Sequence, residues 1–167
     1  MQLNYFNRPY FENGAINKIS EVLSTHEIKI PLICSDPGLS SNGMTDKIKS
    51  LIPNDTSVSF YGETPANPTE KAVNDALELY KKNGCDGVVG FGGGSSMDLA
   101  KAVALMANHE GELINYSVNE GGYEKITETM PMIAIPTTAG TGSEVSVGSL
   151  IIMNDGRKLI LASPHLM

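Results

Sequence analysis

The sequence predicts an α/β fold, in which a mostly parallel sheet is covered by helices on both faces and followed by a C-terminal β-hairpin. Short apolar runs alternate with segments of helical period, a pattern typical of βαβ units. Two glycine-rich loops each follow an apolar run, where a parallel strand would end. The last segment alternates around Asp155-Gly156, which is a strong hairpin signal. With 167 residues, the chain is long enough to bury the core of one such domain.

Four apolar runs are predicted to be the buried strands, and they cover residues 28–35, 58–61, 87–91 and 131–136. A helix is expected after the second run, with Asn67 as its N-cap, Pro68 at the first helical position and Gly84 as its stop. Its apolar face consists of Ala72, Val73, Ala76, Leu77 and Tyr80. A second helix is expected from Ser95 to about Met106. Together these elements predict a Rossmann-like sheet, which binds ligands beyond the carboxyl ends of its strands.

The composition argues against nucleic-acid and membrane partners. The formal net charge is −7, the isoelectric point is near 4.9, and no basic stripe offers the clustered cations that nucleic-acid binding needs. No apolar run approaches the roughly 20 residues that span a bilayer, and the opening residues do not resemble a secretory signal. We therefore expect a cytoplasmic protein.

The cysteines and histidines predict no metal site. Cys34 and Cys85 lie outside any C-x-x-C arrangement and beside apolar segments, so we expect buried, inert thiols. His26, His109 and His165 show neither i, i+4 pairing nor a neighbouring ligand at metal-binding spacing. We expect them on the surface or in loops.

The first glycine-rich loop, GFGGGSSMDLAK at residues 90–101, favours a phosphate site at a helix N-terminus. Ser95 could cap the helix in a capping box with Asp98. The alternative is a tight turn that only permits close packing of helix and sheet. A Walker A lysine is missing and the nucleophile elbow does not fit, which argues against a P-loop kinase and a serine hydrolase. The G-x-G-x-x-G fingerprint also fits poorly, because Ser95 stands where the third glycine belongs.

The second loop, PTTAGTGSEVS at residues 136–146, is rich in small hydroxyl residues. Thr137, Thr138, Thr141 and Ser143 could hydrogen-bond a ribose, an amide or a phosphate. A surface turn bonded to itself is the alternative. Two such loops at one sheet edge favour a ligand site more strongly than either loop does alone.

The motifs GGGSSMDLAK and IPTTAGTGSEV, with SDPGL upstream, resemble the N-terminal half of the iron-containing (group III) alcohol dehydrogenases, which share the dehydroquinate-synthase-like fold. The resemblance implies that Asp36 binds the adenosine ribose and favours NAD over NADP. It implies a pyrophosphate-binding turn at Gly93, Gly94 and Ser95. It further implies cofactor contacts from Asn67, Thr137, Thr138, Thr141 and Lys158. Asp98 and Lys101 also belong to the motif; Asp98 is a cofactor or capping residue, and Lys101 has a solvated or ion-paired side chain as the alternative to a cofactor role.

The resemblance also implies a catalytic divalent metal, iron or another, held by an aspartate and histidines of a second, helical domain. The chain ends at SPHLM, before that domain would begin, so we assign residues 1–167 to the dinucleotide-binding domain and name no catalytic or metal-binding residue, His165 included. We expect this chain alone to be inactive. In the full-length form, small alcohols and aldehydes or ketones would be the substrates. An uncovered domain interface would favour self-association into a homo-oligomer.

Two alternatives remain open from the sequence. The fold could serve a nucleotide-binding or interaction module without catalysis. It could also belong to a lyase related to dehydroquinate synthase.

Overall fold

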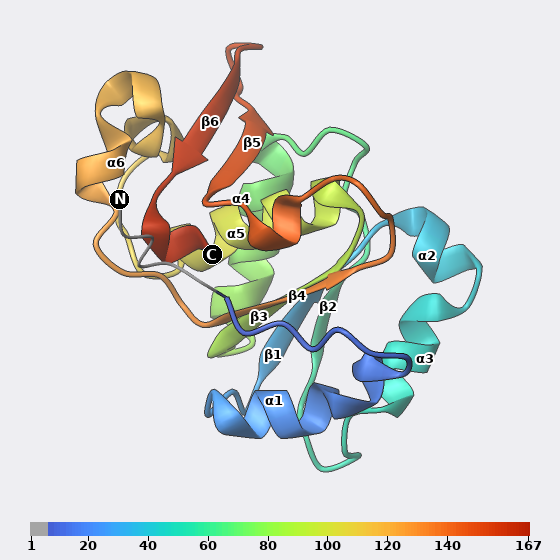
Figure 1. The fold of residues 1–167 in the computed structure, drawn as a ribbon. Helices are drawn as coiled ribbons and strands as arrows, with labels where there is room; N and C mark the ends of the chain where they lie inside the picture. Colours follow the sequence, from blue (N-terminus) through green and yellow to red (C-terminus); the bar gives the residue numbers. More distant parts are fainter. Residues whose placement is uncertain (1–6) are drawn as a thin grey trace, which may run out of the picture.

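The computed structural model describes residues 7–167, and its centre is a four-stranded parallel sheet (Figure 1). The strand order is β2-β1-β3-β4. These strands are β1 (Pro31–Cys34), β2 (Ser59–Tyr61), β3 (Gly87–Gly92) and β4 (Met132–Pro136). Strands β1 and β3 are buried along their whole length. This explains their continuous apolar sequences, because a central parallel strand is covered on both faces.

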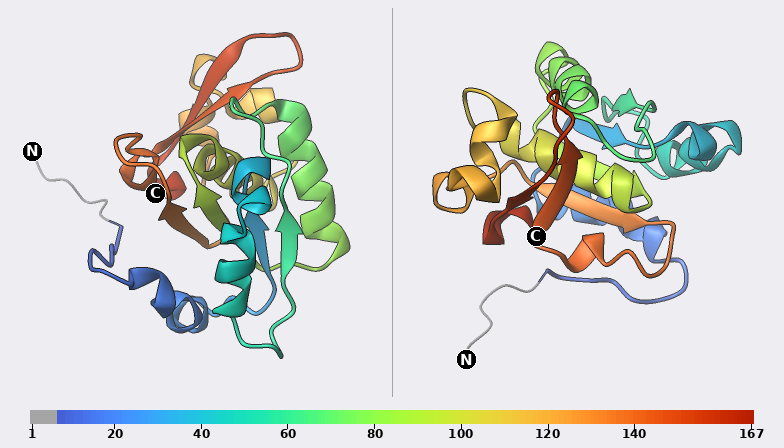
Figure 2. Two further views of the ribbon diagram at one scale, coloured as in Figure 1. Left: turned by 90° about the vertical axis from the view of Figure 1, so that its right-hand side faces the viewer. Right: turned by 90° about the horizontal axis from the view of Figure 1, so that it is seen from above.

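Helices cover both faces of the sheet, as predicted (Figure 2). Helices α1 (Ile19–Thr25) and α3 (Met44–Ser50) pack with Ile33, Val89 and Phe91 on one face. Helices α4 (Glu70–Lys82) and α5 (Gly94–Met106) pack with Leu32, Cys34 and Val88 on the other. Because side chains alternate along a strand, neighbouring residues of β1 and β3 serve different cores.

The hairpin is confirmed as a separate two-stranded unit, β5 (Gly148–Ile152) paired antiparallel with β6 (Lys158–Ala162). The turn contains Gly156 at φ 85°, a conformation that favours glycine. Strand β5 packs against α5. The Ile152 amide donates to the Pro68 carbonyl at 2.9 Å, and the Asn154 amide donates to Glu70 Oε2 at 2.8 Å. The hairpin is thereby fastened to the N-terminal end of α4.

Short elements complete the chain. They are the helices α2 (Pro37–Ser41) and α6 (Gly122–Lys125) and the 3₁₀ turns η1 (Ala15–Lys18), η2 (Leu113–Tyr116), η3 (Val118–Glu120), η4 (Ser143–Val145) and η5 (Pro164–Leu166). Helix α2 begins directly after β1, since Asp36 caps it and Pro37 fits its first position.

Two details of the predicted elements are wrong. Helix α4 is capped by Thr69, whose hydroxyl accepts from the Ala72 amide at 3.2 Å, and not by Asn67. The first strand begins at Pro31 and not at residue 28, because the Asp86 carboxylate takes the amides of Lys29 and Ile30 that would otherwise join a ladder. The buried face predicted for α4 is confirmed in full, and Gly84 follows its end at φ 63°.

Cys34 and Cys85 are buried free thiols, as expected. Burial raises the pKa of each thiol, which makes the reactive thiolate scarce. His26 and His165 are exposed, and His109 is half-buried beside Tyr116. Over residues 7–167, no helix combines the length and apolar character needed to cross a membrane.

Candidate functional site

The carboxyl ends of the parallel strands bring the two predicted loops together. Strand β1 has β2 on one side and β3 on the other, so the connections that leave β1 and β3 pass to opposite faces of the sheet. Such a switch point opens a crevice for a ligand. The Thr137 amide donates to the Gly92 carbonyl at 2.9 Å, which joins the start of the second loop to the glycine turn.

The glycine turn leaves the N-terminus of α5 open. Gly92 has φ 152°, and a Cβ at this position would overlap Ser96. Helix α5 begins at Gly94, with Gly93 as N-cap, and no side chain within the described residues caps it. The first amides of the helix therefore remain available to an anion, which the helix dipole also favours.

The predicted capping box of Ser95 and Asp98 is wrong. Ser95 lies inside the first turn of α5, and its hydroxyl donates instead to the Ala66 carbonyl at 2.5 Å. This bond ties the helix start to the loop that precedes α4. The Asp98 carboxylate points to other partners, described below.

The two loops face each other across this helix start. A Cβ at Gly93 would lie 3.4 Å from Thr138 Oγ1, and a Cβ at Gly94 would lie 3.3 Å from Thr141 Cβ. A pocket of about 290 Å³ opens beside them. Its walls come from the loop before α4, the first turns of α5, the second loop and the hairpin, and are formed by Asn67, Pro68, Gly94, Ser95, Asp98, Thr141, Ser143, Ser146, Gly148, Leu150, Lys158 and Ile160.

Lys158 and Asn67 meet at this pocket although 91 positions separate them in sequence. Lys158 Nζ donates to Asn67 Oδ1 at 3.0 Å, and this contact joins β6 to the loop before α4. The pocket therefore has one cationic side chain, in an otherwise acidic protein.

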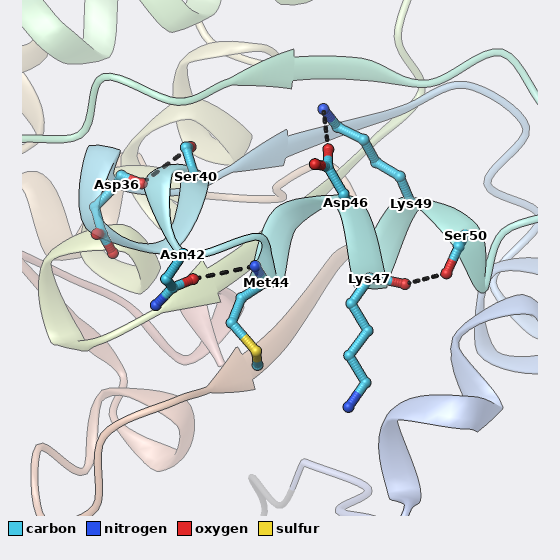
Figure 3. A network of polar contacts seen from close by, with 8 residues as sticks. All are labelled: Asp36, Ser40, Asn42, Met44, Asp46, Lys47, Lys49 and Ser50. Carbon is cyan, nitrogen blue, oxygen red and sulfur yellow. Dashed lines mark hydrogen bonds and ion pairs between the residues drawn. The ribbon is translucent and has the colours of Figure 1, made fainter.

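Asp36 lies outside that pocket but next to the glycine turn. Its Oδ1 accepts from the Leu39 amide at 3.0 Å, and a Cβ at Gly92 would lie 3.2 Å from its Oδ2. Figure 3 shows Asp36 at the start of α2, where its carbonyl accepts a hydrogen bond from Ser40 Oγ at 3.2 Å. Capping thus fixes one carboxylate oxygen and leaves the other beside the crevice between β1 and β3.

Asp98 binds the second loop and the hairpin. Its Oδ1 accepts from Ser143 Oγ at 2.6 Å, and its Oδ2 accepts from the Leu150 amide at 3.1 Å. Its carbonyl accepts from Ser149 Oγ at 2.7 Å. Asp98 lines the pocket, and its carboxylate already has two protein donors.

Lys101 differs most from its predicted state. The side chain is neither solvated nor ion-paired: the residue is 2% exposed, and its ammonium donates to three backbone carbonyls. These belong to Ser143 at 2.7 Å, Gly148 at 3.2 Å and Ser146. Burial lowers the pKa of Lys101 to about 8, against the opposing effect of the Asp98 and Glu144 carboxylates.

The burial of Lys101 is indicated by its sequence neighbours, although a lysine side chain is usually exposed. Lys101 lies among Leu99, Ala100, Ala102 and Val103, so α5 is apolar on every side near this position. A helix that is apolar all round is buried, and a lysine within it needs internal acceptors.

The structure therefore gathers six of the ten predicted cofactor residues in the pocket: Asn67, Gly94, Ser95, Asp98, Thr141 and Lys158. Gly93 and Thr138 face each other at its rim, and Thr137 and Asp36 each lie against Gly92. Across residues 7–167, no three His, Cys, Asp or Glu side chains converge closely enough to hold a metal ion.

Known proteins match this chain along nearly all of its length. The family model for iron-containing alcohol dehydrogenases matches residues 7–167. A 4-hydroxybutyrate dehydrogenase of Cupriavidus necator is 43% identical over 164 residues, a match that covers 98% of this chain and 43% of that protein.

Solved structures agree with the sequence match. A 1,3-propanediol oxidoreductase superposes with a TM-score of 0.91 at 29% identity, over 100% of this chain and 44% of that one. A sulfoacetaldehyde reductase of Bifidobacterium kashiwanohense, solved in complex with NAD+, gives a TM-score of 0.84 at 25% identity, over 100% and 44% of the two chains. The chain thus spans less than half the length of these relatives.

Proposed function

The chain belongs to the iron-containing alcohol dehydrogenase family, and on this basis we propose that residues 1–167 form the NAD-binding half of an alcohol dehydrogenase. The observation that carries the proposal is the meeting of the glycine turn and the threonine-rich loop at an uncapped helix start. The full-length protein would interconvert an alcohol with its aldehyde or ketone by hydride transfer.

The residues present fit a dinucleotide. The amides of Gly94 and Ser95 would bind the pyrophosphate, because α5 leaves them uncapped and glycine leaves room for the phosphate oxygens. The hydroxyls of Thr138 and Thr141 on the facing loop would donate hydrogen bonds to the pyrophosphate, and Thr137 lies at the base of that loop. Lys158, held by Asn67, would orient the nicotinamide ribose. Asp98 would act through Ser143 and the hairpin amide that it binds.

Asp36 would select NAD over NADP. Its Oδ2, beside Gly92, would accept hydrogen bonds from the adenosine ribose hydroxyls. The same negative charge would repel the 2′-phosphate of NADP. The α2 cap keeps the carboxylate in place for both effects.

In the complete enzyme, NAD would accept the hydride of the alcohol carbon. A divalent metal bound by the remainder of the protein would polarise the alcohol oxygen. We propose that residues 1–167 alone bind cofactor without turnover. The chain-length shares of the relatives are consistent with such a division of labour.

The first test is a titration of the purified chain with NADH and with NADPH, following nucleotide fluorescence and thermal stability together. We expect saturable, stabilising binding that is tighter for NADH. A folded chain that neither nucleotide stabilises would contradict the proposal and favour an interaction module without catalysis. Addition of NAD, an alcohol and Fe²⁺ should produce no NADH; steady production would refute the inactivity of the isolated half.

A further inference from the structure

The ammonium of Lys101 lies behind the wall of the pocket and does not line it. We propose that Lys101 is a positioning residue, whose buried ammonium holds residues 143–148 in the conformation that binds the dinucleotide. This inference rests on the proposed function. It concerns a residue that contacts the pocket wall and not the cofactor.

The contacts of Lys101 match its donors one for one. An ammonium has three N–H groups, and Lys101 Nζ has three carbonyl acceptors, on Ser143, Ser146 and Gly148. Between Gly142 and Gly148 the chain passes from the 3₁₀ turn η4 to the hairpin ladder, which starts where the Val147 carbonyl accepts from the Ser163 amide at 3.0 Å. One side chain of α5 therefore joins the η4 turn to the first residue of β5.

All three acceptor residues line the pocket. Ser143 is joined further to Thr141, because its amide donates to Thr141 Oγ1 at 3.4 Å. The position of Thr141 opposite Gly94 thus depends on the segment that Lys101 holds. If that segment relaxed, the facing walls would no longer be spaced for a pyrophosphate.

Asp98 reinforces the arrangement from the same face of α5. It lies three residues before Lys101, about one helical turn, and binds the Ser143 hydroxyl. The charged groups around Lys101 are Asp98 on its own helix and Glu144 on the loop. His26 and His165 line a second pocket of about 200 Å³ that also reaches Lys101.

Replacement of Lys101 by methionine tests the proposal, because Met keeps the apolar stem and removes the donors. We expect Lys101→Met to weaken NADH and NADPH binding by at least about tenfold, without changing the preference between them, since Asp36 is untouched. Lys125→Met is the matched control. Lys125 also donates to two backbone carbonyls, of Asn115 and Glu120, but it is exposed and belongs to α6, which does not line the pocket.

Two further readouts separate a positioning role from a packing role. Without nucleotide, hydrogen exchange of residues 143–148 should accelerate in Lys101→Met and stay unchanged in Lys125→Met. In Lys101→Ala, n-propylammonium should restore part of the NADH affinity, since the second pocket gives it access, whereas n-propanol should not. If neither variant folds, the NADH affinity of the unaltered chain should fall between pH 7 and 9.5, because a neutral amine has two N–H groups for three carbonyls.

The outcomes are distinct. Unchanged NADH affinity in folded Lys101→Met, unchanged exchange, or equal effects of n-propylammonium and n-propanol would overturn this inference and leave the proposed function standing. Where no variant folds, a flat pH profile would do the same. If the unaltered chain does not bind NADH, the proposed function fails and this inference fails with it.

Discussion

The burial of Lys101 gives the free energy of unfolding a contribution that rises with pH between about 8 and 10.5. The folded-state pKa is about 8, below the ordinary value of 10.5. Between these two values the unfolded chain keeps its proton while the folded chain releases it. The cost of burying the charge is therefore present in full below pH 8 and disappears as the pH approaches 10.5.

The size of this effect follows from the same two values. At about 1.4 kcal/mol per pH unit, the interval from about 8 to 10.5 corresponds to about 3 kcal/mol in the free energy of unfolding. The residue is 2% exposed, so solvent screening does not reduce this figure much. Opposing contributions come from Cys34 and from Tyr80, since burial raises the pKa of the thiol and raises the pKa of the phenol to about 12. Their contribution to the free energy of unfolding falls as the pH rises.

The assay is urea unfolding of the unaltered chain and of Lys101→Met at pH 7, 8, 9 and 10.5. Because Cys34 and Tyr80 are present in both proteins, their contributions cancel in the difference. We expect the difference in free energy to be constant up to about pH 8 and then to shift by up to about 3 kcal/mol in favour of the unaltered chain. Parallel curves over the whole range would refute the reasoning, since they would mean that Lys101 keeps an ordinary pKa.

Three further changes test other parts of the argument. Asp36→Gly should raise NADPH affinity relative to NADH about tenfold, measured by competitive titration, and an unchanged ratio would remove Asp36 from cofactor selection. Gly94→Val should abolish NADH binding with a nearly unchanged melting temperature, because its methyls would crowd Thr141 and the phosphate space; normal affinity would leave Gly94 a turn residue only. Thr69→Ala should lower the free energy of unfolding by about 1 kcal/mol, and Asn67→Ala by under about 0.5 kcal/mol. The reverse order in urea unfolding would restore Asn67 as the cap.

The sequence was sufficient for the sheet, its two covered faces and the hairpin, because each depends on local periodicity. The alternation of Leu32 and Ile33 between the two cores, for example, needs no knowledge of distant residues. The sheet edge that holds the candidate site is predicted in the same way, since the carboxyl ends of parallel strands all lie at one edge of the sheet.

The N-cap residue of α4 and the environment of Lys101 are harder to predict from the sequence, because both depend on partners that are distant in the chain. Asn67 and Thr69 both suit an N-cap, and the choice depends partly on Lys158, 91 positions later, which takes the Asn67 amide oxygen. The state of Lys101 depends on carbonyls 42 to 47 positions away. The local sequence predicts the helix that contains Lys101, but it does not predict that the second loop folds over this side chain.

The attachment of the hairpin at both of its strands has a consequence for cooperativity. A two-stranded hairpin has little stability by itself, yet the Leu150 amide of β5 donates to the Asp98 carboxylate of α5, and the hairpin is bonded to the start of α4. Residues 148–162 should therefore open together with α4 and α5 as one cooperative unit, and not fray from the turn inward. Because Lys158 and Asn67 meet across that unit, the event that melts the hairpin is also the event that dismantles the pocket.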